Sequence, residues 1–248
     1  MTNPRRSHDE LSFFQPKATL VSSFIHEAAY GELAERGITV FTNPTASALG
    51  ELFGRLDNRW TGNPFERGFR ELVPTPRAAA RPGSLSSITG AGAQPMHTDA
   101  AYLASPPRYL VLECVSPGEV PCRTEALITN QTQLLEDRPQ LLTDPRWVFL
   151  GGGQSRFYSP VLDTVGGMAR IRFDPCCMSA AYGNKTGLSE MTRLLASYTR
   201  QVSIEWTRRA FVIIDNWRCM HGRGVGGESA PSRRLRRWYL GAQSGLGI

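Results

Sequence analysis

The chain contains the stretch QPMHTD at residues 94–99, in which a histidine and an aspartate stand two positions apart. If this stretch is extended, His97 and Asp99 point to the same side, because side chains alternate along a strand. An imidazole nitrogen and a carboxylate oxygen on one side can bind the same metal ion. An H-x-D pair is common by chance, so its meaning depends on what the rest of the chain supplies.

A third candidate ligand follows the apolar run 211–215, in the stretch DNWRCMHGR at residues 215–223. The chain has only four histidines, and His221 is the one in this stretch. Two imidazoles and one carboxylate on one face of a metal leave positions open for other molecules, which suits iron(II). A structural zinc site would instead be closed by four protein ligands. We therefore predict that His97, Asp99 and His221 are the protein ligands of one iron(II) ion.

The apolar pattern around these residues predicts a mainly β fold with flanking helices. Proline and glycine punctuate many short apolar runs, and a sandwich or jelly roll accommodates such short strands. The predicted strands are 38–41, 109–115, 147–150, 168–173, 202–206, 211–215 and 236–240.

Three segments have the apolar spacing of helices. The first is 24–36, ended by Gly37, and the last is 188–200. The middle one is expected to be capped by Asn43, with Pro44 at its first position. Its predicted buried stripe consists of Leu49, Leu52, Phe53 and Leu56.

Length and composition indicate one globular domain. The 248 residues suffice for one sizeable core, so we expect a tail at 1–16 and a single domain at 17–248. The start lacks the apolar segment of a secretory signal, no run is long enough to span a membrane, and the odd cysteine count suits a reducing compartment, so we expect a cytoplasmic protein. The net charge is +6, but the arginines are mostly scattered, and we expect no nucleic-acid partner and no membrane partner.

Four stretches together resemble the taurine dioxygenase and clavaminate synthase-like family of iron(II)- and 2-oxoglutarate-dependent oxygenases. They are 94–99 with Tyr102 and the following PPRY at 106–109, RTEAL at 123–127, DNWRCMHGR at 215–223, and RRLRR at 233–237. The resemblance runs from about Gly83 to Leu240. It implies a double-stranded β-helix of the jelly-roll, cupin-like type, with iron at one mouth of the barrel.

The resemblance also implies roles for three further residues. In the family a threonine about 25 residues after the metal carboxylate helps to bind 2-oxoglutarate, and Thr124 stands at that spacing. An arginine 11 to 14 residues after the distal histidine binds the 5-carboxylate of 2-oxoglutarate, which matches Arg233. A second arginine four residues later often contacts substrate, which matches Arg237.

Other interpretations of the same side chains stay open at this point. Thr124 also suits an ordinary strand position, and Arg237 also suits a rim residue paired with a surface acid. Arg234 and Arg236 alternate with the two matched arginines, so we expect them to face solvent. Arg172 is expected on a strand surface, with a place in the pocket as the alternative.

The implied activity is that of a dioxygenase that uses Fe(II), 2-oxoglutarate and O2 to hydroxylate a small anionic or amino-acid-like metabolite, releasing succinate and carbon dioxide. Gly92 and Ala93 are small, unlike the polar stretch of the taurine enzyme, which argues against taurine itself. Desaturation, epoxidation and halogenation are alternative outcomes, but related halogenases lack the carboxylate ligand, and Asp99 is present. The alternative to an enzyme is a binding protein that has the same barrel but no catalytic activity.

The stretch GRGVGG at residues 222–227 also fits the G-x-G-x-x-G pattern of dinucleotide-binding proteins. That fingerprint needs a helix opening at the glycines within a complete βαβ unit. Here the sequence ESAP and a basic strand follow instead. We therefore predict a loop at these glycines and no nucleotide site.

Overall fold

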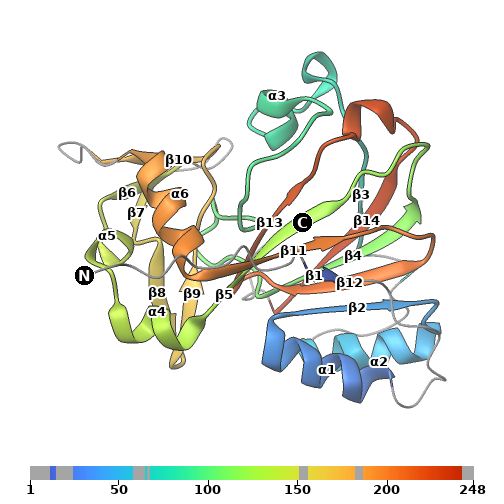
Figure 1. The fold of residues 1–248 in the computed structure, drawn as a ribbon, viewed down its shortest axis with the longest axis horizontal. Helices are drawn as coiled ribbons and strands as arrows, with labels where there is room; N and C mark the ends of the chain where they lie inside the picture. The colour runs from blue at the N-terminus through green and yellow to red at the C-terminus, as the bar shows by residue number, and fades with distance from the viewer. Residues whose placement is uncertain are drawn as a thin grey trace, which may run out of the picture.

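The computed structural model describes residues 12–14, 25–57, 65, 68–150, 156–181 and 187–241. Its larger part consists of two sheets (Figure 1). The five-stranded sheet has the spatial order β2 (Ile38–Thr42), β12 (Ala210–Asp215), β4 (Tyr109–Ser116), β14 (Arg234–Leu240) and β3 (Arg70–Leu72). The four-stranded sheet has the order β1 (Ser12–Phe14), β11 (Thr199–Ile204), β5 (Thr124–Thr129) and β13 (Cys219–Arg223). Apart from β1, which runs parallel to β11, neighbouring strands in both sheets are antiparallel.

The two sheets pack face to face through one apolar core. Both sheets contribute alternate side chains, as expected for strands with one buried face. The core includes Leu110, Leu112, Ala126, Ile128, Val202, Ile204, Val212, Ile214 and Leu235. The predicted mainly β fold is therefore confirmed, and the winding of a double-stranded β-helix stays a finer prediction.

Helices α1 (Ile25–Arg36) and α2 (Ala46–Leu56) cover the outer face of the five-stranded sheet, at the bottom of Figure 1. The predicted stripe on α2 is confirmed, because all four of its side chains are buried there. The predicted cap is wrong. Thr45 caps the helix by accepting a hydrogen bond of 3.1 Å from the backbone N–H of Ala48. Asn43 instead has a φ of 50°, and so stands in the turn before the cap.

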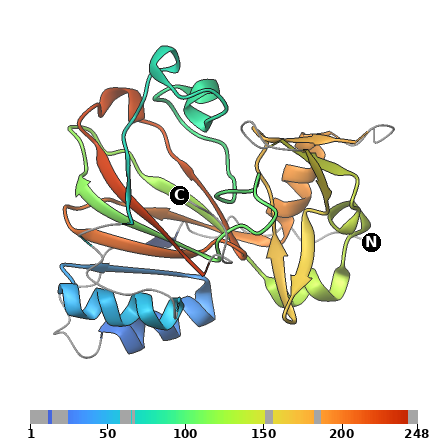
Figure 2. The ribbon, with the colours of Figure 1, turned by 180° about the vertical axis from the view of Figure 1, so that it is seen from behind.

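The chain between β5 and β11 forms a second lobe beside the sheets, on the right of Figure 2. Its elements are α4 (Gln131–Asp137), α5 (Gln140–Thr143), β6 (Trp147–Phe149), β7 (Phe157–Ser159), β8 (Leu162–Val165), β9 (Met168–Ile171), β10 (Met178–Ala180) and α6 (Leu188–Ser197). The lobe has its own core around Trp147, Phe149 and Phe173. Ala101 and Met220 from outside the lobe complete this core, so the lobe is packed against the body of the protein.

The last predicted helix ends earlier than its apolar spacing indicates. Residues 199 and 200 were expected to be helical, but they begin β11, where they pair with Thr129 and Ile128 of β5. The local pattern favoured a helix, and pairing with a distant strand overrides it.

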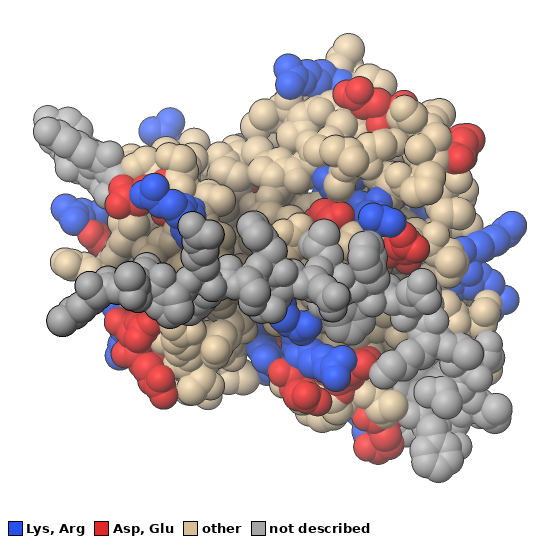
Figure 3. Space-filling view, in the orientation of Figure 1, with Lys and Arg blue, Asp and Glu red and all other residues tan. Residues whose placement is uncertain are grey.

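Three short helical segments lie outside these layers: η1 (Arg77–Ala79), α3 (Leu85–Thr89) and η2 (Gly227–Ser229). Apart from Ser12–Phe14, the expected tail at 1–16 lies outside the described residues. Among the described residues, no helix combines the length and the apolar character that a membrane crossing requires. Basic and acidic side chains lie near one another in several places on the face shown in Figure 3, in agreement with their scattered positions in the sequence.

Arg218 fixes the end of α1. Its guanidinium donates hydrogen bonds to the backbone carbonyls of Ala34 at 2.7 Å and Glu35 at 3.1 Å. These carbonyls lie in the last turn of the helix, where cations are favoured and the acceptors lack helical partners.

Replacing Arg218 with alanine is therefore expected to lower the free energy of unfolding by about 1–3 kcal/mol, because several carbonyls lose a charged donor. Urea unfolding followed by circular dichroism measures this loss. Arg193→Ala, an exposed position on α6, is the matched control and should change the free energy by less than about 0.5 kcal/mol. Equal stability of the two variants would contradict the assignment.

Candidate metal centre

His97, Asp99 and His221 come together as a buried cluster. One ligand atom from each of the three residues lies within 4.8 Å of the others. Two backbone hydrogen bonds hold the histidines side by side, since each N–H donates to the carbonyl of the other residue, at 2.9 and 2.8 Å. The predicted convergence of the three residues is confirmed as geometry.

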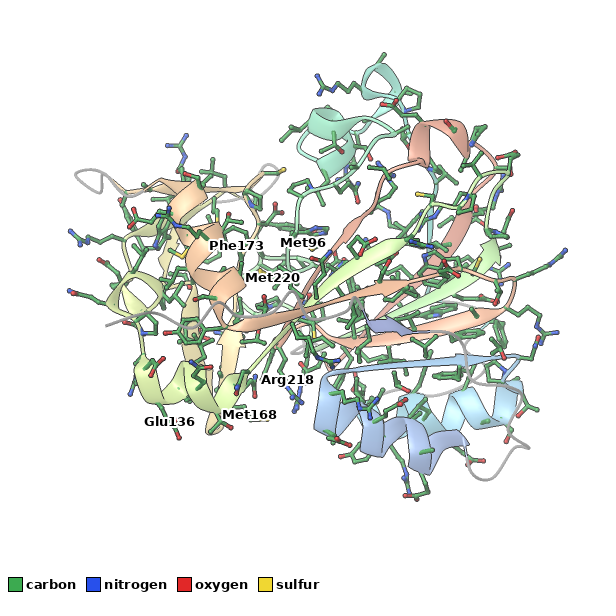
Figure 4. All side chains as sticks on the ribbon, viewed as in Figure 1. Met96, Glu136, Met168, Phe173, Arg218 and Met220 are labelled. Carbon is green, nitrogen blue, oxygen red and sulfur yellow. The ribbon has the colours of Figure 1, made fainter. Side chains whose placement is uncertain are left out.

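The cluster lies where the second lobe joins the sheets. Met96 and Met220, each next to a histidine of the cluster, pack into the core of the lobe. Phe173 packs there too, and Figure 4 shows the three side chains near one another at this junction. The lobe therefore supplies an apolar wall next to the cluster.

The histidine rings present the nitrogens that a metal needs. Nδ1 of His97 lies 3.0 Å from the Pro95 carbonyl, which can only accept, so we place the proton on Nδ1 and leave the lone pair on Nε2. The Nε2 atoms of His97 and His221 lie 3.5 and 4.0 Å from Oδ1 of Asp99. Nδ1 of His221 is buried and has no hydrogen-bond partner among the described residues. The donor set of two imidazoles and one carboxylate fits a divalent iron ion.

The local charges keep two of the three residues in their metal-binding forms. Burial alone would raise the pKa of Asp99, but the Arg237 guanidinium and the two histidines lower it well below its usual range. Burial lowers the pKa of His221 to about 3, helped by His97. Burial also lowers the pKa of His97, but Asp99 outweighs it and the net shift is upward. At neutral pH Asp99 is therefore ionised and His221 neutral, as metal binding requires.

Asn216 holds the backbone of the H-x-D segment in place. Its Oδ1 accepts a hydrogen bond of 2.7 Å from the N–H of Asp99, and its Nδ2 donates to the carbonyls of Asp99 and Pro107, both at 3.0 Å. The side chain is buried, so these bonds satisfy an amide that water does not reach. This role could not be predicted from the sequence, because the two partners are 117 residues apart.

The glycine-rich stretch after His221 serves close packing. A Cβ atom on Gly222 would lie 2.6 Å from the carbonyl oxygen of Gln94, and one on Gly227 would lie 2.2 Å from that of Ala91. Gly222 is the second-last residue of strand β13, and a loop and the short η2 follow it. No helix of the kind that dinucleotide-binding proteins have opens at these glycines, as predicted. These glycines let the segment before the H-x-D pair approach the strand that carries His221.

Thr124 and Arg233 lie together on the inner side of the sheets. Nη2 of Arg233 lies 3.4 Å from the Thr124 hydroxyl, and both residues are buried. Ala126 pairs with His221 across β5 and β13, and Thr124 is two residues along β5, so its side chain shares the face of His221.

Arg233 is a buried cation without an acid. No carboxylate among the described residues forms an ion pair with it, and its Nε donates to the Cys122 carbonyl at 3.2 Å. Burial lowers the pKa of the guanidinium. A buried charge is costly unless it is paired, so an anion bound here would compensate a charge that no described carboxylate balances.

The four arginines of the RRLRR stretch alternate between the inner and the outer side of the sheet, as predicted, but one of the two outer arginines is not solvent-exposed. Arg237 faces inward and forms an ion pair of 3.2 Å with Asp99, a buried acid of the cluster and not a surface one. Arg234 is exposed and lies 3.6 Å from Glu71. Arg236 was expected to face solvent, but it is half-buried, paired with Glu113 at 3.4 Å and stacked on Phe69. Glu113 and Phe69 come from other strands and loops, so the sequence around Arg236 does not reveal them.

Arg172 is not the surface residue that its strand pattern suggested. It is buried and donates hydrogen bonds to the carbonyls of Ala101, Leu103 and Ala104, which follow the H-x-D pair directly. It thereby ties the loop after Asp99 to the second lobe. Burial lowers its pKa to about 10, which still leaves it charged at neutral pH.

No family model and no curated protein matches the sequence. Solved structures do match. An asparagine oxygenase in complex with Fe(II), 3-hydroxyasparagine and succinate has a TM-score of 0.65 at 14% identity, over 88% of this chain and 79% of that one. PvcB, an Fe, alpha-ketoglutarate dependent oxygenase from an isonitrile synthetic pathway, has a TM-score of 0.59 at 22% identity, over 89% and 81%. A taurine dioxygenase from Burkholderia xenovorans has a TM-score of 0.61 at 16% identity, over 91% and 84%. The chain therefore has the fold of iron- and 2-oxoglutarate-dependent oxygenases, as the sequence resemblance predicted.

Proposed function

We propose that this protein is an iron(II)- and 2-oxoglutarate-dependent dioxygenase that hydroxylates an unactivated C–H bond of a small anionic or amino-acid-like metabolite. The observation that carries the proposal is the buried cluster of His97, Asp99 and His221, together with a buried Arg233 that no described carboxylate pairs with. Structures of the same fold hold Fe, alpha-ketoglutaric acid or succinate, which supports the same ligands here.

In this proposal each side chain has one task. His97, Asp99 and His221 hold the iron and leave its other positions open. Arg233 and Thr124 receive the 5-carboxylate of 2-oxoglutarate, for which a guanidinium offers a planar pair of donors. When bound, the iron and 2-oxoglutarate supply the activation of O2 that oxidises the substrate, with release of succinate and carbon dioxide. The apolar wall from the second lobe keeps water away from the cluster.

The presence of Asp99 favours hydroxylation over halogenation. Its carboxylate occupies the ligand position that a halide would need, and Asn216 holds its backbone on both sides. Desaturation and epoxidation use the same residues and differ only in the substrate. A non-catalytic binding protein would have no need of three metal-binding side chains in one buried cluster, so the cluster favours catalysis.

The proposal is tested by adding Fe(II), ascorbate and 2-oxoglutarate to the purified protein together with a panel of anionic metabolites. The expected result is succinate formation that depends on one of them, with a product heavier by one oxygen atom in mass spectrometry. Tight 2-oxoglutarate binding without succinate formation for any compound would favour the binding protein instead.

Arg237 is our candidate for the residue that binds the anionic group of the substrate. It lies beside the cluster through its contact with Asp99, and the aromatic ring of Tyr239 lies 4.6 Å from its guanidinium carbon. Tyr102, half-exposed after the H-x-D pair, is close enough to influence its pKa. Since Asp99 would share its charge with a bound metal, the guanidinium could then also bind a second anion.

Replacing Arg237 with methionine is expected to weaken substrate binding about 10- to 150-fold and to affect 2-oxoglutarate much less, because a charge-assisted contact of about 1.5–3 kcal/mol is lost. Steady-state kinetics with each compound varied in turn measures this difference. Arg234→Met, on the exposed side of β14, is the control. If a neutral ester of the substrate is converted as well as the anion, Arg237 has another role.

A further inference from the structure

Trp206 contacts both residues of the candidate carboxylate site. It follows β11, is nearly fully buried, and its indole Nε1–H donates a hydrogen bond of 3.0 Å to the hydroxyl oxygen of Thr124. The guanidinium carbon of Arg233 lies 5.9 Å from the centre of its ring. Trp206 is therefore in contact with Thr124 through its N–H and with Arg233 through its face.

The hydrogen bonds determine what the Thr124 hydroxyl can do. A hydroxyl has one proton to donate and two lone pairs that accept. Trp206 and Arg233 each direct an N–H at this oxygen, at 3.0 and 3.4 Å, so both lone pairs are engaged. No acceptor among the described residues takes the hydroxyl proton. The hydroxyl therefore can only donate to whatever fills the site.

We infer that Trp206 is a positioning residue that fixes Thr124 as a donor and thereby makes the site selective for a carboxylate over a carboxamide. With Trp206 in place, Thr124 and Arg233 present only donors, which match the oxygens of a carboxylate. A carboxamide NH2 finds no acceptor there and remains unsatisfied. Without the indole N–H, the hydroxyl could turn and accept. This inference rests on the proposed function, in which the ligand is 2-oxoglutarate.

The test uses calorimetric titration of the protein loaded with Mn(II), with N-oxalylglycine as the carboxylate probe and N-oxalylglycinamide as the carboxamide probe. Trp206→Phe keeps an aromatic ring beside Arg233 and removes the N–H together with the rest of the five-membered ring, so the effect of lost packing has to be separated from that of the lost hydrogen bond. It is expected to weaken N-oxalylglycine about fivefold, the effect of one neutral hydrogen bond. The amide should lose no affinity, so the preference for the carboxylate falls about fivefold.

A double-mutant cycle separates this role from mere packing. Thr124→Val is expected to weaken N-oxalylglycine at least as much as Trp206→Phe, and the double variant should be no weaker than Thr124→Val alone. Thr124→Val also gives a test if Trp206→Phe does not fold, because it removes the hydroxyl that Trp206 is inferred to orient and should lower the preference for the carboxylate probe. Trp147→Phe removes an indole N–H that donates to the Leu141 carbonyl in the second lobe, and should leave the Kd unchanged.

Three results would overturn the inference, and the first can be distinguished from the other two. If the wild type does not bind N-oxalylglycine at all, the proposed function falls, and the inference with it. If the wild type binds tightly but the losses of Trp206→Phe and Thr124→Val multiply in the double variant, Trp206 acts through packing alone. An unchanged preference between the two probes in Trp206→Phe leads to the same conclusion.

Discussion

Replacing His221 with alanine is expected to reduce Fe(II) affinity at least about 100-fold and to abolish 2-oxoglutarate turnover. Residues that merely support a metal ligand contribute about 10- to 100-fold in affinity, so removal of one of three ligands has to exceed that range. His221 is neutral and buried beside Asp99, so its lone pair is available at neutral pH. Competition with a fluorescent chelator measures the affinity, and succinate formation measures turnover.

The matched control lies one residue along the same strand. Met220 points from β13 into the core of the second lobe, and Met220→Leu nearly conserves its volume. Met220→Leu should bind Fe(II) like the wild type. Without metal, both variants should unfold at the same temperature as the metal-free wild type. Near-normal iron binding by His221→Ala would show that a different set of residues forms the metal site.

The parts of this structure that could be predicted from sequence are those with local causes. His97 and Asp99 share a side because alternation along an extended segment needs no partner. The inner position of Arg237 in β14 and of Arg233, just before that strand, follows from the same alternation. The stripe on α2 follows from helical spacing within eleven residues.

The parts that could not be predicted depend on contacts between distant segments. The end of α6 is set by the pairing of β11 with β5, some 70 residues earlier in the chain. The burial of Arg172 depends on carbonyls about 70 residues away, and that of Arg236 on Glu113. An arginine in a strand pattern looks the same whether its partner is water or a buried acid.

The candidate site divides along the same line. The candidate metal ligands are histidines and an aspartate, which are metal-binding residue types, so their spacing in the sequence is enough to indicate them. Asn216 contacts the backbone of Asp99 and Pro107, and Trp206 contacts Thr124 and Arg233, and both sets of contacts become visible only when the chain is folded. Burial raises the pKa of the adjacent thiols of Cys176 and Cys177, that of Cys176 to about 11, and keeps them protonated.

Replacing Arg233 with alanine is expected to raise the Kd for 2-oxoglutarate by roughly two to three and a half orders of magnitude. Removal of one partner from a buried ion pair costs about 3–5 kcal/mol, because the remaining charge stays buried without compensation. Arg233 meets the condition for this large effect, since it is buried and no described carboxylate pairs with it. Calorimetric titration of the Mn(II)-loaded protein with 2-oxoglutarate gives the Kd directly.

The choice of control follows from the structure. Arg236 is unsuitable, because Arg236→Ala would leave the buried Glu113 without its partner and lower stability for an unrelated reason. Arg234 is exposed and lies next to Arg233 in the chain. Among the described residues it forms a surface ion pair with Glu71, so Arg234→Ala should leave the Kd within about twofold. Arg233→Lys keeps the charge but lacks the planar pair of donors, and should recover only part of the loss. If Arg233→Ala and Arg234→Ala weaken binding equally, the effect comes from the general positive charge of β14, and the 5-carboxylate is bound elsewhere.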